Sequence, residues 1–128
     1  MKKFSLFISI FLISACAGVS MSVGYTIPEF INVGTYGKFK TTLSKDEFYQ
    51  CLLYNETFTG TGTVLSDRSF DFVEQTYKND QIIFRADNSM GMTNLMFIYN
   101  EGGSVTFVIQ PRYGQREEIF NFYKINCS

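Results

Sequence analysis

The residue types able to carry out chemistry in this chain are acids and cysteines, since its 128 residues include three cysteines and no histidine. Without histidine, a Ser-His-Asp or Cys-His nucleophilic site cannot be built, and neither can the usual zinc site. Asp67, Asp71 and Glu74 come closest to a carboxylate group for acid-base work or calcium binding. In a strand, Asp71 and Glu74 would point to opposite faces, and the EF-hand pattern is missing, so solvated surface charge is the better interpretation. A carboxylate dyad assembled across strands is the alternative.

One glycine-rich stretch, Thr59-Gly60-Thr61-Gly62-Thr63, superficially looks like a loop that binds phosphate. It lacks the lysine that follows in such loops, and it leads into a predicted strand where they lead into a helix. We interpret it as an ordinary turn or strand edge. Taken together, these patterns predict a chain that is not an enzyme and that binds no metal or cofactor.

The N-terminus predicts export. Lys2 and Lys3 are followed by ten residues, 4–13, of which eight are apolar. This run is too short to span a bilayer as a helix, but it has the size of the apolar region of a signal peptide. The next residues, Ile13-Ser14-Ala15-Cys16, resemble the lipobox of bacterial lipoproteins, in which a cysteine receives diacylglycerol before cleavage on its N-terminal side. The resemblance covers about the first 17 residues.

This resemblance implies a signal peptide at 1–15 and a multiply acylated Cys16. With Ala17 after that cysteine, it also implies sorting to the outer membrane, on the periplasmic side, in a host that has one. Two alternatives stay open. Ala15-Cys16-Ala17 also fits an ordinary secretory cleavage site, and an uncleaved anchor is a third possibility.

The two remaining cysteines, Cys51 and Cys127, form an even pair, which in an exported chain predicts one disulfide. Closing a loop of about 77 residues would stabilise the fold by roughly 4 kcal/mol through the entropy of the unfolded chain. Two buried thiols are the alternative.

The net charge of the chain limits the kinds of partner that are expected. Removal of residues 1–15 takes away two of the 11 basic residues and none of the 12 acidic ones, which leaves a net charge of −3. With no basic excess, nucleic acid is not an expected partner. The sequence also has no polybasic membrane patch, so acyl chains rather than charge would supply the membrane affinity. Residues 16–24 form a small, flexible lipidated tether, and residues 25–128 form one domain.

The clearest local signal in that domain is a helix at about 44–54. Ser44 and Glu47 form a capping box, Leu43 and Phe48 occupy the positions of a hydrophobic staple, and Cys51 lies on the apolar face. Such a short helix must lie on a sheet. Residues 25–42, interrupted by Pro28 and two glycines, predict one or two irregular edge strands.

After Asn55 the apolar residues recur in short runs split by turn residues, as is typical of strands. The runs are 57–65, 69–77, 81–86, 92–99, 105–109 and 119–125, with hairpin turns at 78–80, 88–91 and 100–103. We therefore expect an α+β fold, in which an antiparallel β-meander of about five or six strands carries the one short helix on one face.

Two features predict an interaction surface. The first is the connection 111–116 between the last two strands, where Arg112, Tyr113 and Arg116 are of the types enriched in protein interfaces. The second is an aromatic second sheet face, built from Tyr77, Phe97 and Tyr99, which a partner, a second copy of the chain or the membrane interface would cover. We expect a lipid-anchored accessory or structural module of the cell envelope that binds another envelope protein. The alternative is an immunity or inhibitor protein against a secreted toxin or an envelope hydrolase.

Overall fold

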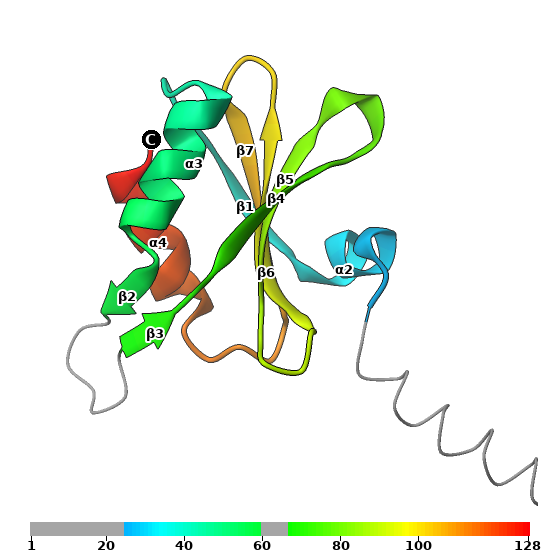
Figure 1. Cartoon of the computed structure of the whole chain (residues 1–128). Helices are drawn as coiled ribbons and strands as arrows, with labels where there is room; N and C mark the ends of the chain where they lie inside the picture. The colour runs from blue at the N-terminus through cyan, green and yellow to red at the C-terminus, as the bar shows by residue number, and fades with distance from the viewer. Residues whose placement is uncertain (1–24, 60–66) are drawn as a thin grey trace, which may run out of the picture.

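A computed structural model describes residues 25–59 and 67–128 as an antiparallel sheet with helices on both faces (Figure 1). Its helices are α2 (Ile27–Gly34), α3 (Lys45–Tyr54) and α4 (Arg116–Asn126), with a single turn of 3-10 helix, η1 (Lys78–Asp80). The sheet strands are β1 (Thr35–Lys40), β4 (Phe72–Thr76), β5 (Ile82–Asp87), β6 (Thr93–Asn100) and β7 (Ser104–Ile109). A separate hairpin pairs β2 (Thr57–Thr59) with β3 (Asp67–Ser69).

The expected α+β fold with an antiparallel meander is confirmed. The five strands lie in the order β1-β7-β6-β5-β4, so β4 to β7 form the meander and β1 joins its edge beside β7. Both turns expected after β5 and β6 are present, and each pairs its flanking strands antiparallel. At the second of these turns, Gly103 has a φ of 87° and lies directly against the Thr41 carbonyl, so only glycine fits.

Helix α3 forms as the sequence predicts. Its N-cap Ser44 accepts a hydrogen bond from the Glu47 amide at 3.3 Å, and the Glu47 carboxylate accepts one from the Ser44 amide at 2.9 Å. Phe48 and Leu52, one turn apart, are fully buried against the sheet. The capping box therefore starts the helix where its apolar face can reach the core.

Two segments that the sequence predicts as strands are helices instead. Residues 119–125 are not a strand but the body of α4, in which Ile119 and Tyr123 are buried four residues apart, and Cys127 is buried directly after the helix. Acidic residues in the first turn and Lys124 in the last turn also favour a helix. Residues 25–34 are likewise not an edge strand, because Thr26 and Glu29 form a second capping box and Pro28 fits the first turn of α2.

The sheet has two unlike faces. The face against α3 and α4, which we call the core face, holds 15 buried residues with Phe97 at their centre. Phe97 packs against five rings, those of Phe39, Phe48, Phe72, Phe107 and Tyr123. On the opposite face, which we call the groove face, α2 is the one helix among the described residues, and five buried apolar residues lie there, namely Phe30, Ile83, Met96, Ile98 and Val108.

The aromatic second face expected from Tyr77, Phe97 and Tyr99 does not form. Phe97 is completely buried in the core face, and Tyr99 packs on that same face. Tyr77 alone lies on the groove face. The error is one of register, since both alternate positions of β6 carry apolar residues and either set could have faced the helices.

Candidate functional site

The predicted disulfide is present in the structure. Cys51 in α3 is bonded to Cys127, which follows α4, and their Cα atoms are 5.8 Å apart. Thr41 strengthens this junction, because its buried hydroxyl donates a hydrogen bond to the Cys127 carbonyl at 2.9 Å. The end of the chain is thereby fixed to the core face. Cys16, the predicted lipidation site, lies outside the described residues.

The expected surface of Arg112, Tyr113 and Arg116 is not a single exposed unit. The connection that carries it leads from β7 into α4 rather than between two strands. Arg112 is exposed, whereas Tyr113 is half-buried against the core, with its ring centroid 6.4 Å from that of Phe70. The Arg116 guanidinium lies 5.8 Å from the centre of the Tyr36 ring. Only Arg112 is therefore fully presented to a partner.

The carboxylates considered for catalysis or calcium binding form no cluster where the structure describes side chains, and the side chain of Asp67 lies outside that part. Asp71 is exposed before β4, and Glu74 is 3.3 Å from the ammonium group of Lys45. Asp46 and then Glu74, through their hydrogen bonds to Lys45, raise the pKa of that ammonium group. Within 25–59 and 67–128, no three side chains of the His, Cys, Asp and Glu types stand close enough to hold a metal ion. Of the glycine-rich stretch, positions 60–63 lie outside the described residues.

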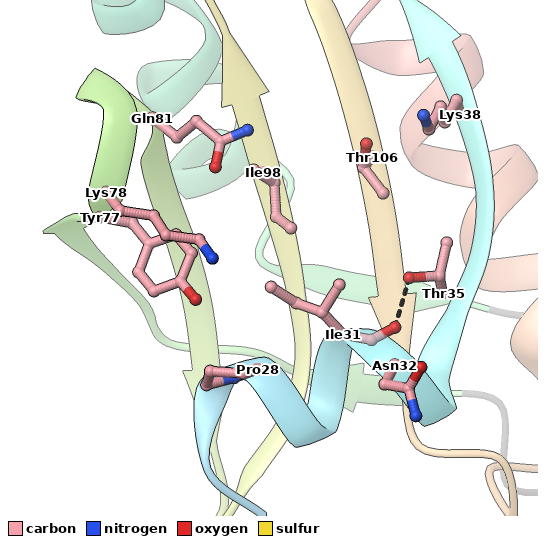
Figure 2. Close-up of a pocket in the computed structure, with 10 residues that line it drawn as sticks. All are labelled: Pro28, Ile31, Asn32, Thr35, Lys38, Tyr77, Lys78, Gln81, Ile98 and Thr106. Atoms are coloured by element: carbon pink, nitrogen blue, oxygen red, sulfur yellow. Dashed lines mark hydrogen bonds between the residues drawn. The ribbon is translucent and has the colours of Figure 1, made fainter.

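A groove on the groove face is a concave site lined by ten of the described residues. It has a volume of about 470 Å³, which is within the range of small-ligand sites. Its floor is Ile98 of β6 and Thr106 of β7, and its walls come from α2, from β1 and from the turn that holds η1 (Figure 2). The lining residues are Pro28, Ile31, Asn32, Thr35, Lys38, Tyr77, Lys78, Gln81, Ile98 and Thr106.

Positive charge and amide groups surround the floor of this groove. Lys38 stands on β1 and Lys78 on the turn at the opposite wall, where its ammonium group lies 5.6 Å from the centre of the Tyr77 ring (Figure 2). No acidic residue is among the described residues that line the groove. Gln81 is held in place by Asn100, to which it donates a hydrogen bond at 2.6 Å. The arrangement can bind an anion that also carries an apolar part.

Helix α2 forms one wall because its two ends are fixed. At its start, the Thr26 hydroxyl and then the Thr26 amide, through their hydrogen bonds, lower the pKa of the Glu29 carboxyl below its usual value. At its end, a Cβ on Gly34 would lie 2.7 Å from the Ile109 carbonyl oxygen, so only glycine lets the helix approach β7 this closely. Between these ends, Phe30 is buried against the sheet and Ile31 faces the groove.

Sequence reasoning missed this groove. Its two lysines are far apart in the chain, and their proximity depends on the pairing of β1 with β7 and of β4 with β5. The available signal was the Thr26-Ile27-Pro28-Glu29 capping box, which would have predicted α2 and hence a helix on the second sheet face.

Comparisons of the chain with family models, with curated proteins and with solved structures find no match. Over the described ranges, every helix is too short or too polar to cross a bilayer. The function must therefore be inferred from the residues of this chain.

Proposed function

We propose that this chain is a lipid-anchored, non-catalytic protein of the cell envelope that acts as an accessory binding module on another envelope protein. Acyl chains on Cys16 hold it in the membrane, which is the outer membrane in a host that has one. The tether 16–24 joins this anchor to the folded domain 25–128.

The observation that carries this proposal is the disulfide between Cys51 and Cys127 in a chain that begins with a lipobox-like segment. Disulfides form and persist outside the reducing cytosol. The two features are separated by at least 35 residues and depend on unrelated chemistry, yet both favour the same compartment. A binding role is supported by the groove between α2 and η1, which combines the apolar side chains of Ile31 and Ile98 with lysine and amide groups at its walls.

The test is lipidation at Cys16. In cells producing the full chain, we expect the membrane fraction to contain a protein whose N-terminal residue is an acylated Cys16, as read by mass spectrometry. Cys16→Ser should lose the acyl mass and leave the membrane fraction, with the fold intact. Ser14→Ala, which keeps a small residue next to the cleavage region, is the matched control and should behave as the unchanged chain. A Cys16→Ser protein that still carries lipid and sediments with membranes would contradict the proposal.

The exposed Arg112 favours a second candidate function, an immunity or inhibitor protein that binds a secreted toxin or an envelope hydrolase. In-cell crosslinking of the lipidated chain separates the two. A stoichiometric envelope protein supports the accessory module, whereas a secreted toxin or hydrolase, lost with Arg112→Ala, supports the inhibitor.

A further inference from the structure

We infer that the groove lined by Lys38 and Lys78 faces the bilayer and binds the phosphate groups of anionic phospholipids. The inference rests on the proposed function, because the acylated Cys16 brings the groove to the membrane. It goes further in giving the domain a fixed orientation, with the groove face toward the lipid and the core-face helices α3 and α4 away from it.

The position of the tether is the first support. The sequence of residues 17–24 carries mostly small side chains, a composition typical of linkers, and a coil of about eight such residues would have an r.m.s. span of only ~15 Å. This segment leads through Tyr25 directly into α2, whose Pro28, Ile31 and Asn32 line the groove. The wall of the groove is therefore the part of the folded domain nearest to the anchor.

The distribution of charge is the second support. Lys38 and Lys78 approach the groove from opposite walls, and Lys40, two residues along β1 and exposed, lies on the same face of the sheet as Lys38. The exposed acids Asp46 and Glu47 lie on α3, and Glu117 and Glu118 on α4, all on the far side of the sheet. Negative lipid headgroups attract lysines and repel carboxylates within a Debye length, so this distribution favours one orientation.

The groove also matches the chemistry of a headgroup. The ammonium groups of Lys38 and Lys78, on opposite walls, can each donate hydrogen bonds to headgroup phosphates, and the amide of Asn32 is a further donor in the α2 wall. The Thr35 hydroxyl is already engaged, because it donates to the Ile31 carbonyl. Glu29, the acidic residue of α2, has its carboxylate engaged by Thr26 in the helix cap. Tyr25 and Val33, at the two ends of α2, are 47% and 44% exposed, and tyrosine is enriched at membrane interfaces.

The experiment measures how fast a water-soluble acylating reagent modifies individual lysines. The lipidated chain, purified from membranes, is reconstituted into vesicles of phosphatidylcholine alone or with added phosphatidylglycerol. We expect Lys38 and Lys78 to react severalfold more slowly only when phosphatidylglycerol is present, while Lys124 on α4 reacts equally in both. Lys38→Glu, which places a carboxylate across from Lys78, should abolish the protection of Lys78, and the matched control Lys124→Glu should retain it.

The anchor and the groove can fail separately in this experiment. Flotation of the vesicles in high salt tests the anchor first, and a chain that does not float overturns the proposed function together with this inference. A chain that floats but shows equal lysine rates in both vesicle types overturns the inference alone. Equal slowing of Lys124 also overturns it, as does protection of Lys38 and Lys78 by inorganic phosphate in vesicles without anionic lipid, since the site would then be one for a dissolved anion.

Discussion

The two faces of the sheet differ in how completely helices cover them. The covered face stabilises the fold, whereas the open face has room for a ligand. On the core face, α3 and α4 together with the disulfide enclose 15 buried residues, most of them aromatic or large aliphatic. On the groove face, the single short helix α2 leaves an open, lysine-lined depression beside five buried residues. A closed aromatic core leaves no room for a ligand, whereas a partly covered sheet face does.

The core face also satisfies the polar groups of its aromatic residues. The hydroxyls of Tyr99, Tyr123 and Tyr49 donate hydrogen bonds to the carbonyls of Leu43, Asn55 and Phe72, at 2.7, 3.0 and 3.2 Å. Burial raises the pKa of Tyr123 well above its usual range, so this hydroxyl remains a donor. These bonds join the segment before α3 to β6, the middle of α3 to β4, and the residue after α3 to α4.

The largest effect is expected at the centre of the core face. Phe97→Ala removes a fully buried ring that contacts five others, and should lower the free energy of unfolding by about 5 kcal/mol, the upper end for such changes. Its neighbour Ile98 points to the groove face, and Ile98→Ala should cost about 2 kcal/mol because the groove is already open. Urea unfolding of both variants checks this order, and an equal or reversed loss would contradict the contrast between the faces.

The second largest loss of stability is expected on removal of the disulfide. Replacing Cys51 and Cys127 together by alanine should lower the free energy of unfolding by about 4 kcal/mol, because the unfolded chain gains the entropy of an opened loop. The double replacement avoids leaving a lone thiol. Thermal unfolding under oxidising and reducing conditions checks the effect. The unchanged chain should lose stability on reduction while the double variant does not, and a double variant sensitive to reduction would contradict this assignment.

Removing the N-cap of α3 or of α2 should change stability less than the substitutions above, and allows the two faces to be compared. Ser44→Ala removes the cap of α3, which supports the core face, and should lower the free energy of unfolding by about 1 kcal/mol. Thr26→Ala removes the cap of α2 at the edge of the domain, where the helix can open without unfolding the core. We expect faster amide exchange confined to α2, with a smaller change in global stability. Equal global losses would show that α2 is as integral to the fold as α3.

The smallest effect concerns pH. The Ser44 amide and then the Ser44 hydroxyl lower the pKa of the Glu47 carboxyl below 4.5, as Thr26 does for Glu29. A carboxylate with a lower pKa in the folded state stabilises the fold above its unfolded pKa, and this contribution is lost as the pH falls through the folded value. Glu47→Gln should therefore reduce the loss of stability between neutral pH and about pH 3, measured by denaturant midpoints. An unchanged pH profile would contradict the capping role.

The sequence predicts those parts of the molecule that local signals specify. The capping box at Ser44, the hairpin turns after β5 and β6, and the pairing of Cys51 with Cys127 are all confirmed. The strand predicted at 119–125 is wrong because Ile119, Phe120, Phe122 and Tyr123 favour strands intrinsically, whereas the charges at the two ends of α4 and packing against the sheet favour a helix.

The candidate site could not be predicted for a related reason. Its walls come from three segments that only the completed sheet brings together, namely α2, β1 and the turn at η1. Lys38 and Lys78 look like ordinary surface charges in the sequence. Strand pairing brings both lysines to the walls of one groove, which the one described helix on that face leaves open.

The orientation of the two faces toward the membrane is the most direct test of this account. The lipidated chain, labelled with ¹⁵N and placed in nanodiscs with spin-labelled anionic headgroups, would report which amides lie near the lipid. We predict strong broadening for α2, Lys38 and Lys78, and sharp signals for Asn121 and Lys124 on α4. Broadening of α4 with sharp signals from α2, or equal broadening of both, would contradict it.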